Sequence, residues 1–100
     1  ELNGVELISA EIPETFSLSQ NYPNPFNPVT NIKFSIPKTG NVKLAVYDIT
    51  GKEVMILLNG NLSAGTYNTD LDASKLASGV YFYKLETEEY QNVKKMILVK

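Results

Sequence analysis

The sequence contains no histidine, cysteine, tryptophan or arginine. Histidine and cysteine are the usual ligands of zinc and copper, so a site for either metal would lack its ordinary donors. The same two residues supply the commonest general base and the commonest thiol nucleophile. Their absence indicates a non-enzymatic chain, and we assign it no catalytic residue, no metal and no cofactor.

All the basic residues are lysine, and the formal net charge is -2 at pH 7. Nucleic-acid-binding proteins usually present a basic face on which arginine contacts phosphates and guanine edges. We therefore expect no nucleic-acid partner. No apolar run approaches the roughly 20 residues that span a bilayer, which predicts that the chain has no transmembrane segment.

The start of the chain, Glu1 to Ser9, lacks a basic patch followed by an apolar stretch, so it is not a signal peptide. We expect a piece of a longer secreted protein whose export signal lies upstream. A length of 100 residues suits one domain. We assign residues 1–15 to a linker with a short strand over Val5 to Ile8, and residues 16–100 to the folded domain.

Short runs along the chain alternate apolar and polar residues with period two. Clear examples are Phe16 to Leu18, Ile32 to Ile36 and Val42 to Val46. This alternation is typical of half-buried strands in an antiparallel sheet. Strands separated by turns at intervals of about ten residues indicate an all-β sandwich or barrel. The further strands are expected over Glu53 to Leu58, Thr66 to Leu71, Val80 to Thr87 and Tyr90 to Val99.

Turn residues separate these runs. The segment from Asp48 to Gly51 predicts a type I turn, in which the aspartate accepts backbone N–H groups and the glycine takes a positive φ. Asn59-Gly60 predicts a second turn, and Glu88-Glu89 predicts a hairpin. Over Asp72 to Ala77 we expect one helical turn at most.

A proline-rich segment precedes the second strand. Proline fixes φ and removes a backbone donor, and it favours an extended conformation in the residue before it. The segment is therefore expected to be a stiff extended connection whose two aromatic rings plug one end of the core. A proline-rich ligand for another domain is the alternative, although the spacing does not repeat PxxP. The segment reads Asn21, Tyr22, Pro23, Asn24, Pro25, Phe26, Asn27 and Pro28.

Leu76, Gly79 and Tyr81 follow the spacing of the tyrosine corner of immunoglobulin-like sandwiches. In that motif a tyrosine near the start of a strand sends its hydroxyl back to the upstream backbone. Tyr83 lies on the same face as Tyr81 by alternation. Buried core aromatics are one interpretation, and an exposed aromatic platform for sugar or nucleic acid is the other.

The last segment contains four consecutive apolar residues, Met96 to Val99, which suggest a strand covered on both faces. Lysines flank them at Lys94, Lys95 and Lys100. Such lysines keep an apolar edge strand from pairing with other chains, or they contact a receptor. An edge-strand homodimer is a third outcome that a sandwich allows.

Asp70 and Asp72 lie on one face of an expected strand, an arrangement that a Ca²⁺ site could use. Exposed carboxylates near turns are far commoner than ion sites, and we assign no metal here.

Four segments, taken in order, resemble the type A C-terminal sorting domain of type IX secretion, the Por secretion tail family. The resemblance extends over about Phe16 to Lys100. It departs at Leu71-Asp72-Ala73, where many members have an aromatic residue followed by Asp-Gly. The immunoglobulin-like domain of flagellar hook-capping proteins is also similar. The four segments are Tyr22 to Ile32, Val46 to Val54, Ala64 to Leu85 and Lys94 to Lys100.

The resemblance implies an immunoglobulin-like antiparallel β-sandwich of about seven strands at the C-terminus of a secreted cargo protein. Such a domain directs its cargo from the periplasm across the outer membrane. A sortase-like peptidase then removes it, and the cargo is attached to the cell surface or released. The implied partners are the outer-membrane secretion machinery, that peptidase and an upstream cargo domain in the same chain.

The resemblance also implies which residues matter. Recognition is implied for Gly79, Tyr81, Lys94, Lys95 and Lys100, and structural roles are expected for Tyr22, Pro23, Asn24, Pro25, Phe26, Asp48, Gly51, Leu76 and Tyr83. Two other functions stay open: an accessory carbohydrate- or protein-binding module of a secreted enzyme, and a passive spacer.

Overall fold

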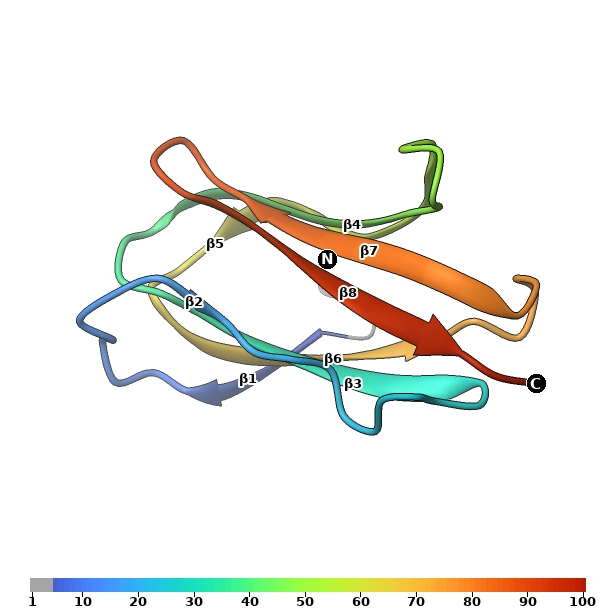
Figure 1. Ribbon diagram of the computed structural model, residues 1–100. Helices are drawn as coiled ribbons and strands as arrows, with labels where there is room; N and C mark the ends of the chain where they lie inside the picture. Colours follow the sequence, from blue (N-terminus) through green and yellow to red (C-terminus); the bar gives the residue numbers. More distant parts are fainter. Residues whose placement is uncertain (1–4) are drawn as a thin grey trace.

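The computed structural model describes residues 5–100, and the described residues form strands, turns and loops without a helix. The expected strand near the start of the chain is present as β1, and the last strand is β8 (Figure 1). The strands are β1 Val5–Ser9, β2 Ser17–Leu18, β3 Val29–Ile36, β4 Gly40–Tyr47, β5 Glu53–Leu62, β6 Gly65–Asp72, β7 Gly79–Glu86 and β8 Gln91–Leu98.

The strands form two sheets that face each other (Figure 1). One sheet has the order β1-β6-β3-β2 and the other has the order β5-β4-β7-β8. All strand pairs within the sheets are antiparallel. The expected all-β antiparallel sandwich is confirmed. The described residues contain eight strands, one more than the expected count of about seven.

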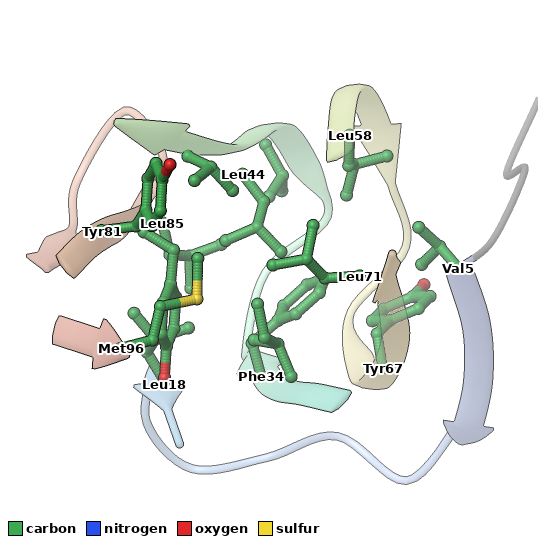
Figure 2. Packing of buried hydrophobic residues seen from close by; sticks show 14 of the residues in the cluster. Val5, Leu18, Phe34, Leu44, Leu58, Tyr67, Leu71, Tyr81, Leu85 and Met96 are labelled. Atoms are coloured by element: carbon green, nitrogen blue, oxygen red, sulfur yellow. The ribbon is translucent and has the colours of Figure 1, made fainter. Parts of the chain in front are cut away.

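The core lies between the two sheets and follows the period of two. In β3, Ile32, Phe34 and Ile36 are fully buried, while the residues between them reach the outer surface. Figure 2 shows Leu44 and Leu71, from opposite sheets, pointing into the same space. Fully burying an aliphatic or aromatic side chain of this size contributes about 1.5–3 kcal/mol. The alternation therefore places the sheets face to face.

The turn that begins at Asp48 forms as its residues predict. The Asp48 carboxylate accepts bonds from the Thr50 hydroxyl, the Thr50 amide and the Lys52 amide at 2.6, 2.9 and 3.1 Å. These bonds lower the pKa of the Asp48 carboxyl, and the bond from the Thr50 hydroxyl has the largest effect. Gly51 has a φ of 89°, which a residue with a side chain rarely adopts. The turn is thus fixed by local contacts alone.

One local expectation is wrong, and another is met. Asn59-Gly60 is not a turn, because both residues lie inside β5 and pair with β4, where Gly60 faces Val42. Pairing along a neighbouring strand outweighs a local turn preference. Over Asp72 to Ala77 the chain makes a single turn, within the expected limit of one helical turn. Ser74 N–H donates to Asp72 and Leu76 N–H donates to the Ala73 carbonyl, which makes a turn.

The last strand is also placed differently from expectation. β8 is an edge strand, and its residues are covered on one face only. Met96 and Leu98 are buried, whereas Ile97 is half-buried and Val99 is exposed. The apolar run suggested cover on both faces, but the second sheet can cover only the inward-facing residues of an edge strand.

β1 pairs with β6 and completes the first sheet at the edge opposite β2. Residues 1–4 of the expected linker lie outside the described residues, and the division at residues 15 and 16 stays a prediction. β1 approaches β6 closely at Gly65. A Cβ built on Gly65 would lie 2.8 Å from the Ser9 carbonyl oxygen and 3.1 Å from the Leu7 side chain.

Gly65→Ala should therefore loosen β1 and lower the free energy of unfolding by about 1–3 kcal/mol, as overpacking does. Urea unfolding measures the loss, and faster amide exchange in β1 locates it. Gly60→Ala is the matched control, because nothing lies within 4 Å of its built Cβ. Equal stability of the two variants would show that β1 does not need the glycine.

Candidate functional site

The tyrosine corner is present. The Tyr81 hydroxyl donates to the Ala77 carbonyl at 2.6 Å, and the ring is only 8% exposed. Tyr83 is fully buried in the same face of β7. The aromatic-platform interpretation of these two rings is wrong, since neither presents its face to solvent. Both tyrosines hold the sandwich together from inside.

The segment that begins at Gly79 lies directly beside β8. Gly79 pairs with Leu98, and Tyr81 pairs with Met96. Two parts of the sequence that the resemblance singles out are therefore neighbours in one ladder. Gly79 has a φ of 153° at the start of β7. Together β7 and β8 form a compact hairpin unit at one edge of the second sheet.

The three lysines that the resemblance implicates do not form one patch. Lys95 lies on the outer face of the second sheet opposite Phe82, while Lys94 is half-buried on the core side of the edge strand. Alternation along a strand sends neighbours to opposite faces. Across residues 5–100, none of Lys94, Lys95 and Lys100 takes part in an ion pair.

Lys100 is held by two contacts with the loop before β7. Its backbone N–H donates to the Ser78 hydroxyl at 3.0 Å, and its ammonium group donates to the Ser74 carbonyl at 2.6 Å. These bonds place the cation beside the turn that leads to Gly79, about one strand length from Lys94 and Lys95.

The proline-rich segment is bent, which corrects the expected extended conformation. It bends at residues 23–25 and again at 27–28, and the peptide bonds before Pro23, Pro25 and Pro28 are cis. Of the two expected aromatic anchors, Phe26 is 3% exposed and plugs the core. Tyr22 is 80% exposed, so its expected role as an anchor is wrong.

The same segment covers the outer edge of β8. The Asn24 carboxamide accepts from Ile97 N–H at 3.0 Å, and the Gln20 carboxamide donates to the Lys95 carbonyl at 2.7 Å. Phe26 N–H donates to the Ile97 carbonyl, and the Phe26 carbonyl accepts from Val99 N–H. We call Gln20, Asn24 and Phe26 the edge clamp. It satisfies backbone groups that an edge strand would otherwise offer to another chain.

A buried polar network anchors the edge clamp to the core. The Tyr83 hydroxyl donates to the Ser19 carbonyl at 2.6 Å and accepts from Asn21 N–H at 2.8 Å. The Asn21 carboxamide donates to the Thr30 hydroxyl and to the Pro23 carbonyl. Burial raises the pKa of Tyr83 to about 12, against the opposing effect of the bond from Asn21.

Sequence reasoning missed Asn21 and Thr30. A signal for Thr30 existed, because it is in phase with the buried residues Ile32 and Phe34 of the same strand. A polar residue at an inward position indicates a buried hydrogen bond. Asn21 had no such signal, since it lies in a loop and is buried only by distant contacts.

The structure does not build a metal site from the aspartates considered above. Asp70 and Asp72 are exposed on the outer face of β6, and the Asn31 carboxamide donates to Asp70 at 2.8 Å. Within the described part of the chain, no three histidine, cysteine, aspartate or glutamate residues come together to hold a metal. The same residues include no helix of the length and apolarity needed to cross a membrane.

The fold and these contacts define a β-sandwich whose last strand is an edge strand held by an Asn-Pro segment. Residues 20–100 match the family model described as the secretion system C-terminal sorting domain. The chain belongs to this family, and it is a C-terminal sorting signal for type IX secretion. The family is not a catalytic one. No curated protein matches the chain.

Removing the Tyr83 hydroxyl should destabilise the fold. Tyr83→Phe leaves the buried Asn21 amide without its partner and removes the part-buried bond to the Ser19 carbonyl, which costs about 1–3 kcal/mol of unfolding free energy. Chemical denaturation measures the loss. Tyr22→Phe, at an 80% exposed ring, is the control and should leave the stability unchanged.

The same hydroxyl should make stability fall at high pH. The folded state keeps the Tyr83 proton up to a pKa of about 12, whereas the unfolded chain releases it near the ordinary value of 10.0. Between these values ionisation favours the unfolded state, so the folded state loses about 1.4 kcal/mol per pH unit. The stability advantage of the wild type over Tyr83→Phe should therefore shrink from pH 10 upward. An advantage that stays constant to pH 12 would contradict the buried-hydroxyl assignment.

Proposed function

We propose that the secretion machinery recognises this domain through the β7–β8 unit, at Gly79, Tyr81, Lys94, Lys95 and Lys100. The observation that supports this is the ladder in which Gly79 and Tyr81 pair with β8. Tyr81 acts by shaping the unit, because its ring is buried, while Lys95 and Lys100 carry exposed charge. Recognition then depends on a folded hairpin and not on a linear tail.

The proposal includes the fate of the cargo. A sortase-like peptidase separates the upstream cargo domain from the sandwich after transit from the periplasm, and the cargo is attached to the cell surface or released. The domain is a substrate of that peptidase and performs no catalysis itself. The lack of histidine and cysteine supports this, since the usual catalytic bases and thiols are absent.

The contacts of β8 disfavour a homodimer that pairs through the edge of this strand. An edge-strand homodimer would have to use another edge, because Asn24 and Phe26 already bond Ile97 and Val99. A carbohydrate-binding module is not favoured, because Tyr81 and Tyr83 are buried in the core.

Fusing residues 1–100 to a periplasmic reporter in a host with the pathway tests this function. The reporter should leave the cell, and a reporter that stays periplasmic would refute the sorting role. Substituting alanine at Lys94, Lys95 and Lys100 should reduce export severalfold because the cationic contacts are lost. Alanine at the exposed Lys33, Lys52 and Lys75 is the matched control, with equal thermal unfolding required of both variants.

A further inference from the structure

The outer faces of the two sheets differ in chemistry. An antiparallel sheet with one face on the core usually presents polar residues on the other. The sheet β1-β6-β3-β2 obeys this rule, with Asn31, Lys33, Ser35, Thr66, Asn68 and Asp70 on its outer face. The sheet β5-β4-β7-β8 departs from it, because its outer face carries Lys43, Lys84, Glu86 and Lys95 together with six large apolar residues, which are Tyr47, Ile56, Val80, Phe82, Val93 and Ile97.

A groove of about 300 Å³ lies on this apolar face. Tyr47 and Phe82 are cross-strand neighbours at its floor, and Val93 and Ile49 lie at its sides. Ile49 is 72% exposed on the turn fixed by Asp48. Figure 1 shows this green loop rising from the end of β4, away from the other sheet. The turn therefore holds the large apolar side chain of Ile49 in solvent.

Lys84 and Asp48 line the groove, and Lys95 lies next to it across from Phe82. The Lys84 ammonium lies 5.5 Å from the centre of the Tyr47 ring, and Lys95 is the exposed cross-strand neighbour of Phe82. The Lys84 ammonium nitrogen lies 3.8 Å from a carboxylate oxygen of Glu86 and forms an ion pair with it, whereas Lys95 has no ion pair among the described residues. The nearby Asp48 carboxylate is already bonded within its own turn. An apolar centre beside Lys84 and the unpaired Lys95 is complementary to an apolar side chain flanked by carboxylates.

Because of the edge clamp, we expect such a partner to bind the outer face of the sheet and not the edge of β8. A peptide adding to β8 as a further strand needs free backbone groups. Along Lys95 to Val99 those groups are bonded to Gln20, Asn24 and Phe26. A sugar is a poor occupant too, because the Lys84 ammonium already lies over the Tyr47 ring. Side-chain contacts on the outer face remain.

We propose that the outer face of β5-β4-β7-β8, centred on the Ile49 groove, docks a partner protein that presents an apolar side chain flanked by carboxylates. The inference rests on the proposed sorting function and names the chemistry of its partner. Lys95 belongs to both surfaces, since it stands at the junction of the groove and the β7–β8 unit. Single exposed apolar residues are ordinary, but apolar residues gathered around one groove, as Tyr47, Ile49, Phe82 and Val93 are, indicate an interaction site.

A photo-crosslinking amino acid placed at Val93 in the exported reporter fusion tests the docking surface. The expected product is an adduct with one outer-membrane protein of the pathway host. The crosslinked peptide of that protein should contain an apolar residue next to aspartate or glutamate. The same probe at Lys33, exposed on the polar sheet, is the positional control and should give no such adduct.

Two substitutions separate the face from the fold. Ile49→Ser and Lys95→Glu, introduced into the fusion that carries the Val93 probe, should each reduce the adduct severalfold. Ile12→Ser is the matched control, because Ile12 is 68% exposed in a loop away from the groove. Asn24→Ala, which opens the edge clamp, should not increase the adduct if the partner binds the face. Equal resistance to periplasmic proteolysis checks that all variants fold.

Several results would overturn the inference. One is an equal amount of adduct from the probes at Val93 and Lys33. Another is an adduct that forms only with a second copy of the domain, with the reporter or with lipopolysaccharide. A third is an amount of adduct that Ile49→Ser and Lys95→Glu do not change. An exported reporter without any adduct would refute the docking surface and leave the sorting function standing. A wild-type reporter that is not exported would refute both.

Discussion

The hydroxyl group of Tyr83 joins the two sheets inside the sandwich. Its ring stands on β7, and it bonds the Ser19 carbonyl and the Asn21 amide, which follow β2 of the other sheet. A buried hydroxyl and a buried amide both need partners, so each fixes the position of the other. Thr30 extends the network to β3 through Asn21. The path of the Asn-Pro segment depends on this contact.

Once Asn21 is fixed, the residues after it meet the edge of β8. Asn24 and Phe26 bond the backbone of Ile97 and Val99, and the edge is closed to other chains there. Exposed strand edges otherwise invite aggregation. Closing the edge leaves the side chains as the accessible feature of β8. Preventing edge pairing and contacting a receptor are therefore compatible roles for the lysines of β8, because the first concerns the backbone of the strand and the second concerns its side chains.

Much of the fold could be predicted from local patterns. The alternation of Ile32 and Phe34 in β3 gives the inward face, and the Asp48 turn needs only its own residues. Tyr81 was recognisable because its hydroxyl reaches back only four residues, to Ala77. Asn59-Gly60 misled because β4 pairs through it. The exposed ring of Tyr22 could not be foreseen, since burial depends on which elements pass nearby.

By itself the sequence determined most of the strands, the Asp48 turn, the tyrosine corner and the lack of histidine and cysteine. Only the tertiary structure decided that Lys94 and Lys95 face different surroundings, that the β8 edge is closed, and that one outer sheet face gathers apolar residues around a groove. The physical reason is range. Period and turn chemistry act over a few residues, whereas the Tyr83–Ser19 bond joins residues 64 apart, and packing alone can bring them together.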